Sequence, residues 1–144
     1  MLIAALFCLV LLIATTLLHY EVLTLLGLTL DRLHWPRRLK VVAAVLGCFI
    51  GHSLGVLLYA LGLWWLMHTE AGLSLPGGAA PWGLSDALAF SAEAYTSLGL
   101  GDVIPTGPAR LLAGVEALNG LLLIAWSASF LYIEMERYWK RRGA

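Results

Sequence analysis

Long apolar stretches separated by short polar segments make up most of the chain. Three stretches contain no Lys, Arg, Asp or Glu, namely Met1 to Tyr20, Val41 to Thr69 and Ala117 to Ile133. A helix needs about 20 residues to cross a hydrocarbon core of about 30 Å, so each stretch suffices once its flanking residues are included. The pattern therefore predicts three membrane-spanning helices, over 1–30, 41–67 and 109–136.

Proline, glycine and charge mark the connections between these helices. The segment 31–40 contains Pro36 and a cluster of basic residues, which neither continue a helix nor stay in lipid, so we expect a short turn. A glycine- and proline-rich stretch over 72–83 follows the second helix. Ser85 is then expected to cap a helix over 85–96, which is too short to cross a bilayer.

The connection between the second and third long helices begins and ends on the same side of the membrane. It holds the short helix over 85–96 and then a glycine-rich run over 97–102, which together predict a re-entrant loop. Non-helical backbone at membrane depth is tolerated only where protein shields it or water lines it. One chain cannot shield this segment alone, so several copies are expected to surround a common polar axis.

The composition excludes an ordinary soluble domain. Of 144 residues, 60% are hydrophobic and 12% charged, which leaves too little polar surface to cover three such helices. The N-terminal stretch lacks a basic beginning and exceeds a signal peptide's apolar run, so we expect a retained helix. Cys8 and Cys48 lie inside apolar segments and are expected to pack as small hydrophobic residues.

Charge is distributed unequally although the formal net charge is zero. Eight of the nine Lys and Arg residues fall on one side of the predicted membrane, leaving only Arg110 on the other. The eight are Arg32, Arg37, Arg38, Lys40, Arg137, Lys140, Arg141 and Arg142. Because basic loops stay in the cytoplasm, the N-terminus is predicted outside, and residues 137–144 form a basic cytoplasmic tail.

The segment Ser97-Leu98-Gly99-Leu100-Gly101-Asp102 resembles the filter signature T-V-G-Y-G-D of potassium channels. In that filter, stacked backbone carbonyls replace the water shell of the ion. Asp102 is followed three residues later by Pro105, as in the D-x-x-P of these channels. The sequence EALNGLLLIAWSASFLY is similar to the inner helix of small prokaryotic members of this family, which also carry an extra first helix.

The resemblance implies an all-α membrane protein with a homotetrameric pore. Each subunit would place an extra helix (1–30) and a turn (31–40) before a pore module (41–136), which comprises the outer helix 41–67, pore helix 85–96, filter 97–102 and inner helix 109–136. Potassium ions would be held by the backbone carbonyls of Ser97, Leu98, Gly99 and Leu100 and by the Ser97 hydroxyl. Glu93, Gly101 and Asp102 would support the filter.

Two substitutions distinguish this segment from the usual signature. Leu100 stands in place of a tyrosine whose hydroxyl ties the filter to neighbouring helices, although the second pore loop of some two-pore-domain potassium channels also reads G-L-G-D. Ser97 stands where threonine provides the innermost hydroxyl ligand. Glu93 is expected to share a proton with Asp102 and brace the filter, the alternative being a local Ser or Thr partner.

Three residues of the inner helix are further candidates. Gly120 is either a gating hinge or a site of close packing. Trp126 either faces lipid or a neighbouring element, or forms a hydrophobic constriction that gates the pore. Glu116 is an acid inside the membrane, with Arg110 or a group behind the filter as the expected partner.

His19 and His52 lie at the same predicted depth. Each is twelve residues, or about 18 Å, from the turn on its own helix, so their side chains are expected to face each other. Such a pair is a candidate for proton sensing or Zn²⁺ binding, against the alternative of two buried, hydrogen-bonded histidines.

The sequence thus predicts a potassium-selective channel of the cell's inner membrane that conducts K⁺ passively. The alternatives are a weakly selective monovalent cation channel and a non-conducting assembly module that retains the pore fold. We expect no enzymatic activity, because no nucleophile is paired with a base. The expected partners are membrane lipids and further copies of the chain, with neither nucleic acid, a small-molecule substrate nor an organic cofactor.

Overall fold

The computed structural model describes residues 2–68, 83–99 and 107–140. Within these ranges the chain forms four helices and no strand. They are α1 (Leu2–Arg32), α2 (Arg37–His68), α3 (Leu84–Tyr95) and α4 (Pro108–Lys140). The predicted all-α class is confirmed.

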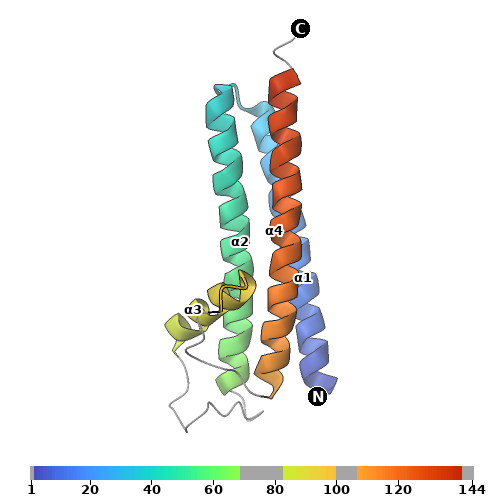
Figure 1. Cartoon of the computed structure of the whole chain (residues 1–144), viewed down its shortest axis with the longest axis vertical. Helices are drawn as coiled ribbons and strands as arrows, with labels where there is room; N and C mark the ends of the chain where they lie inside the picture. Colours follow the sequence, from blue (N-terminus) through green and yellow to red (C-terminus); the bar gives the residue numbers. More distant parts are fainter. Residues whose placement is uncertain (1, 69–82, 100–106, 141–144) are drawn as a thin grey trace.

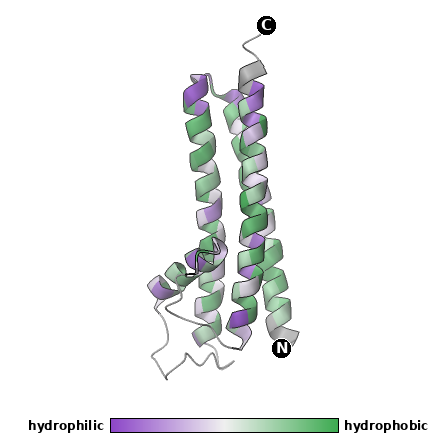
Figure 2. Cartoon of the chain, viewed as in Figure 1, coloured by the Kyte–Doolittle hydropathy of each residue, from purple (hydrophilic) through white to green (hydrophobic). Residues whose placement is uncertain are grey.

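The three long helices run side by side, with the α1–α2 turn and the end of α4 at one end of the molecule (Figure 1). Ala5–Arg32, Arg37–His68 and Pro108–Arg137 are each long and apolar enough to cross a membrane. Hydrophobic residues cover most of their length, as Figure 2 shows. In the most apolar part of each long helix, only 22% to 33% is buried within the chain. Much apolar surface is therefore left for lipid or for other copies of the chain.

The turn between α1 and α2 is held by hydrogen bonds around Pro36. The Pro36 carbonyl accepts hydrogen bonds from the amides of Leu39 (2.9 Å) and Lys40 (3.2 Å), which begins α2. The Lys40 ammonium donates to the Leu30 carbonyl at 2.6 Å and so satisfies a free carbonyl in the last turn of α1. Near this end Arg137 of α4 lies 3.5 Å from Asp31 of α1, so the basic end also joins these two helices.

α1 and α2 approach closely because α2 lacks side chains along their contact. A Cβ atom on Gly47 would lie 2.6 Å from Leu26, and one on Gly51 would lie 3.0 Å from Val22. Further along, a Cβ on Gly62 would lie 2.7 Å from Leu11. Gly47 and Gly51 form a G-x-x-x-G pair, the small-residue spacing that lets membrane helices approach closely.

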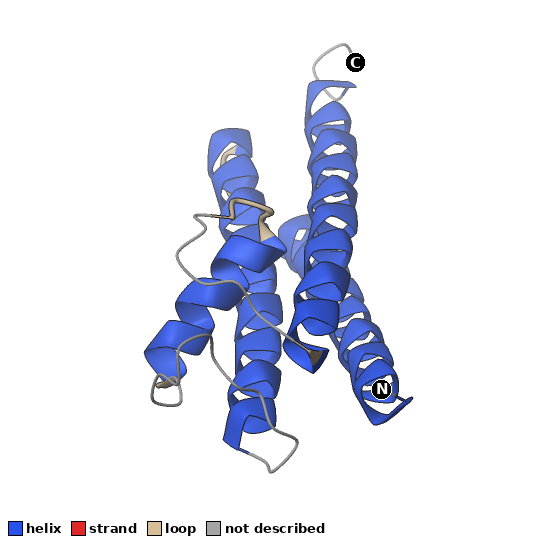
Figure 3. Cartoon of the chain, turned by 60° about the horizontal axis from the view of Figure 1, so that its bottom comes forward, coloured by secondary structure: helices blue, strands red, loops and turns tan. Residues whose placement is uncertain are grey.

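α3 lies obliquely against α2 and α4 at the end away from the turn (Figures 1 and 3). Its buried residues, Ala87, Ser91 and Tyr95, recur every four positions and therefore share one face. The described parts of α1 and α3 make no close backbone contact. The expected cap, Ser85, is wrong: the cap is Gly83, whose amide donates to the Asp86 carboxylate at 3.0 Å, because the helix begins one residue earlier than predicted.

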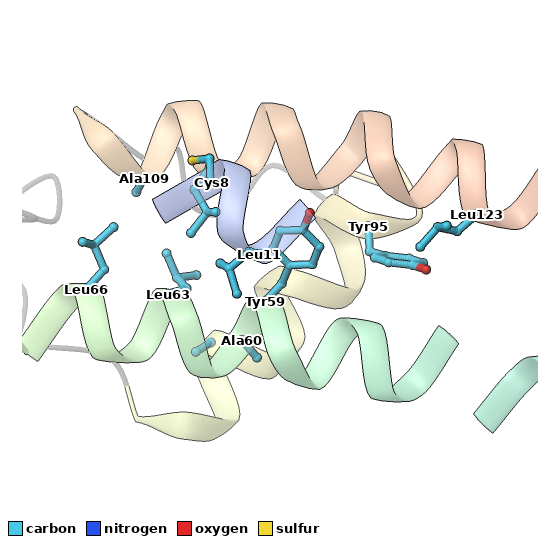
Figure 4. Packing of buried hydrophobic residues seen from close by; sticks show 11 residues of the cluster. Cys8, Leu11, Tyr59, Ala60, Leu63, Leu66, Tyr95, Ala109 and Leu123 are labelled. Carbon is cyan, nitrogen blue, oxygen red and sulfur yellow. The ribbon is translucent and has the colours of Figure 1, made fainter. Parts of the chain in front are cut away.

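The buried core joins all four helices around two tyrosines (Figure 4). Tyr59 of α2 and Tyr95 of α3 are 0% and 1% exposed. Beside them, the amide of Asn119 donates to the Thr15 hydroxyl of α1 (2.8 Å) and to the Tyr59 hydroxyl (3.1 Å). A single side chain of α4 thus bonds both other long helices.

We expect Asn119→Leu to lower the stability of the folded protein by about 1 kcal/mol, because the substitution removes two buried hydrogen bonds between membrane helices. The thermal midpoint of purified protein in detergent measures this change. Leu118→Ala is the matched control, since Leu118 is 63% exposed on the same helix. Equal midpoints for the two variants would contradict a stabilising role of Asn119.

Candidate functional site

The end of α3 leads directly into the candidate filter. The amide of Ser97 donates to the Ala94 carbonyl (3.0 Å) and the amide of Leu98 to the Glu93 carbonyl (2.9 Å). With Thr96 as the C-cap, these two bonds form a Schellman motif, the usual way in which a helix end satisfies its last carbonyls. The first residues of the candidate filter, Ser97 and Leu98, are therefore fixed to the last turn of α3.

Ser97 and Gly99 both have left-handed backbone conformations, with φ values of 57° and 56°. Ser97 occupies the Schellman position that glycine usually fills, and a non-glycine residue there costs about 1–3 kcal/mol. Ser97, Leu98 and Gly99 are exposed in the single chain, Leu98 by 63%. Leu100, Gly101 and Asp102 lie outside the described residues.

The site lies far from both ends of α4. A Cβ on Gly120 would collide with the Tyr95 carbonyl, so the end of α3 touches α4 at this glycine. α4 begins at Pro108 and is continuous through Gly120. At 1.5 Å per residue, the contact lies about 18 Å along α4, near the middle of the candidate membrane span Pro108–Arg137.

Glu116 lies one turn before Gly120, against the same face of α3. It is 1% exposed, and its Oε2 atom is 3.5 Å from the hydroxyl of the fully buried Ser91. Its Oε1 atom has no hydrogen-bond partner within the described part of the chain. Of the two expected partners, Arg110 is exposed, and a role of Glu116 in supporting the filter stays a prediction.

Glu93 is half-buried on α3. The described contacts involve its backbone carbonyl, which accepts from Leu98. Asp102, the expected partner of its carboxyl group, lies outside the described residues. The brace between these two acids stays a prediction.

The rings of His19 and His52 lie next to each other, tilted by 38°, with centroids 4.7 Å apart. His19 Nε2 is 2.9 Å from the Ser127 hydroxyl of α4, and His52 Nδ1 is 2.9 Å from the Tyr95 hydroxyl of α3. The pair therefore belongs to a buried polar cluster that includes all four helices. Within the described ranges, no three His, Cys, Asp or Glu side chains gather as a metal site would need, so Zn²⁺ binding has no third ligand of these types there.

Trp126 of α4 lies against α1. Its ring centroid is 5.8 Å from that of His19 and 6.3 Å from that of Tyr20, and the residue is 39% exposed. It borders a shallow groove between α1 and α4 that Phe130 and Leu23 also line. Its role as a gate stays a prediction.

Sequence reasoning missed Tyr95, Ser91 and Asn119 as candidate residues. These residues bond partners at least 25 positions away in the sequence, so their roles depend on how the helices pack. One signal was available, because Ser91 and Tyr95 are four residues apart, like Glu116 and Gly120. That common spacing is typical of two helix faces in contact.

Comparisons with known proteins agree with this arrangement. A family model described as "Ion channel" matches residues 52–137, which is more than half of the chain. A stretch of 60 residues is 40% identical to the inward rectifier potassium channel Kirbac3.1 of Paramagnetospirillum magnetotacticum. That match covers 41% of this chain and 20%, or about a fifth, of the relative. No solved structure matches the chain.

We expect Gly120→Ala to destabilise the protein by about 1–3 kcal/mol, because the added methyl group has no room beside the Tyr95 carbonyl. Thermal unfolding in detergent measures the loss. Gly114→Ala is the matched control on the same helix, since a Cβ there meets no atom within 4 Å. A Gly120→Ala variant as stable as Gly114→Ala would instead favour the hinge interpretation.

Proposed function

Because this chain belongs to the ion channel family, we propose that it forms a potassium-selective channel in which four copies surround one pore. Residues 41–136 form the pore module, residues 1–30 an additional helix on each subunit, and residues 31–40 the turn between them. K⁺ crosses the cell's inner membrane passively through the filter 97–102. The similarity of a 60-residue stretch to a protein named as a potassium channel supports the choice of ion.

The observation that carries the proposal is the position of the end of α3. This helix ends where it touches Gly120, and the exposed residues 97–99 follow immediately. Exposed polar backbone cannot face lipid at such a depth, since each unsatisfied group costs several kcal/mol. Surrounding copies and a water-filled axis supply the missing partners.

The ion would be held by backbone oxygen atoms. The carbonyls of Ser97, Leu98, Gly99 and Leu100 and the hydroxyl of Ser97 replace its hydration shell, and no organic cofactor takes part. The C-terminal end of α3 points towards these residues, and its partial negative charge favours a cation. Leu100 provides a carbonyl but no side-chain hydroxyl, so the filter depends on other contacts for its support.

The charge distribution supports an orientation with the basic end in the cytoplasm. The turn residues and the end of α4 lie together at that end, as Figure 1 shows, and the N-terminus of α1 would then lie outside. Glu93 and Asp102 would brace the filter. Gly120 and Trp126 remain the proposed positions for a gate along α4.

Reconstituted wild-type protein is expected to pass K⁺ in preference to Na⁺. With K⁺ on one side of a planar bilayer and Na⁺ on the other, the reversal potential should lie towards the K⁺ equilibrium potential. Gly99→Ala should reduce the K⁺ current about tenfold, because a left-handed non-glycine residue costs about 1–2 kcal/mol. Gly107→Ala, with the same φ of 56° but outside the filter, is the matched control.

Other outcomes of this recording favour the alternatives. A reversal potential near zero would indicate a weakly selective cation channel. The absence of current at several pH values would favour a non-conducting assembly module. A Gly107→Ala variant that loses as much current as Gly99→Ala would remove residue 99 from the proposed conduction path.

Proton sensing by His19 and His52 is a second proposal for the same channel. Protons on both rings would make two charges 4.7 Å apart repel each other, so protonation of the pair is expected to move the rings apart and disturb the contact with Tyr95. The other titratable groups around the pair are Tyr20 on α1, Cys48 on α2, Tyr95 on α3 and, acting through Tyr95, Glu116 on α4.

We expect the wild-type K⁺ flux to fall as the pH is lowered, because a proton on either ring charges this buried pair. His19→Leu should flatten this profile, because it removes one partner of the pair. His34→Leu is the control, since His34 lies in the exposed turn. An unchanged profile in His19→Leu would show that another group senses the proton.

A further inference from the structure

Tyr95 is the last residue of α3 and stands two positions before Ser97. It is held between two glycines on different helices. A Cβ on Gly55 of α2 would lie 3.4 Å from its ring, and a Cβ on Gly120 of α4 would collide with its carbonyl. Both long helices thus lack a side chain where Tyr95 enters, so the ring and the backbone of this residue are enclosed together.

The hydroxyl group of Tyr95 fixes the remaining freedom of this residue. It lies 2.9 Å from His52 Nδ1, and the two rings meet edge to face with centroids 5.8 Å apart. A buried hydroxyl without a partner is costly, so this bond selects one orientation of the ring. Figure 4 shows the side chain extending from α3 into the space between α2 and α4.

The partner of Tyr95 is itself held by the first helix. The His52 ring lies against His19 of α1, and His19 bonds the Ser127 hydroxyl of α4 at 2.9 Å. α1 and α3 make no close backbone contact within the described residues. The two histidines therefore provide one path from α1 to the end of α3.

The backbone after Tyr95 has little freedom of its own. The Schellman bonds of Ser97 and Leu98 connect these residues to Ala94 and Glu93, in the same helical turn as Tyr95. A left-handed serine persists only where its surroundings enforce it. A displacement of Tyr95 would therefore be passed directly to Ser97.

We propose that Tyr95 is the positioning residue of the filter, and that its hydroxyl bond to His52 sets the place of Ser97 relative to α1 and α2. This inference rests on the proposed channel function, in which Ser97 contributes the innermost oxygen ligands. Tyr95 itself touches no ion. It acts by holding the end of α3 at one depth and one rotation.

The test is a double-mutant cycle with Tyr95→Phe and His52→Leu. Tyr95→Phe removes only the hydroxyl group, so we expect the ring to stay in place while the K⁺ to Na⁺ permeability ratio falls at least about threefold. His52→Leu should cause a similar fall. The double variant should be no worse than either single variant, because both remove the same bond.

Tyr59→Phe is the matched control. Tyr59 is equally buried, and its hydroxyl accepts a hydrogen bond from Asn119, but it belongs to α2 and not to α3. We expect it to lower the thermal midpoint and to leave the permeability ratio unchanged. A fall in the ratio that is equal for Tyr59→Phe and Tyr95→Phe would show a general loss of packing and would overturn the proposal.

The same cycle measured on the thermal midpoint separates this inference from the proposed function. If wild-type protein carries no K⁺ current, the channel proposal fails, but coupled midpoint shifts of Tyr95→Phe and His52→Leu still support the tie between α3 and α2. Additive shifts, or permeability effects that multiply in the double variant, would overturn it. Gel filtration of each variant establishes that the same assembly is compared.

Discussion

The structure depends on the requirement that backbone polar groups inside a membrane have partners. The three long helices satisfy this requirement internally, but α3 does not, because it ends at mid-depth and a non-helical segment follows. Its last carbonyls are bonded by the amides of Ser97 and Leu98, and its face is covered by α2 and α4. The backbone of residues 97–99 remains exposed in the single chain, so its polar groups need partners from elsewhere.

The helices approach closely because glycines stand at their contacts, as well as because hydrophobic side chains pack there. Lipid is as apolar as leucine, so membrane helices associate through tight packing and hydrogen bonds between them. Gly51 admits Val22, and Gly120 admits the end of α3. The buried polar groups then fix the register of this packing, since Asn119 bonds both α1 and α2 and would lose both bonds if α4 slid by one turn.

The sequence predicted the helices and spans well, because uncharged stretches, proline and basic clusters report directly on a membrane environment. It also placed His19 opposite His52, since equal distance from a short turn means equal depth in antiparallel helices. It did not identify Tyr95 or Ser91, which look like ordinary residues of an amphipathic helix until α2 and α4 are in place. The cap of α3 was misplaced because Gly83 and Ser85 both precede the apolar run, and only the Asp86 contact distinguishes them.

The role of α1 follows from the residues that it covers. The ion channel family model begins at residue 52 and does not include this helix. In this chain, however, α1 packs closely against Gly47, Gly51 and Gly62 of α2, and His19 of α1 lies beside His52. Without α1, the His52 ring and the glycines of α2 would face lipid. Asn119 would also lose its hydrogen bond to the Thr15 hydroxyl. The first helix therefore completes the packing of α2 and α4, because the side chains that hold α3 depend on partners that α1 provides.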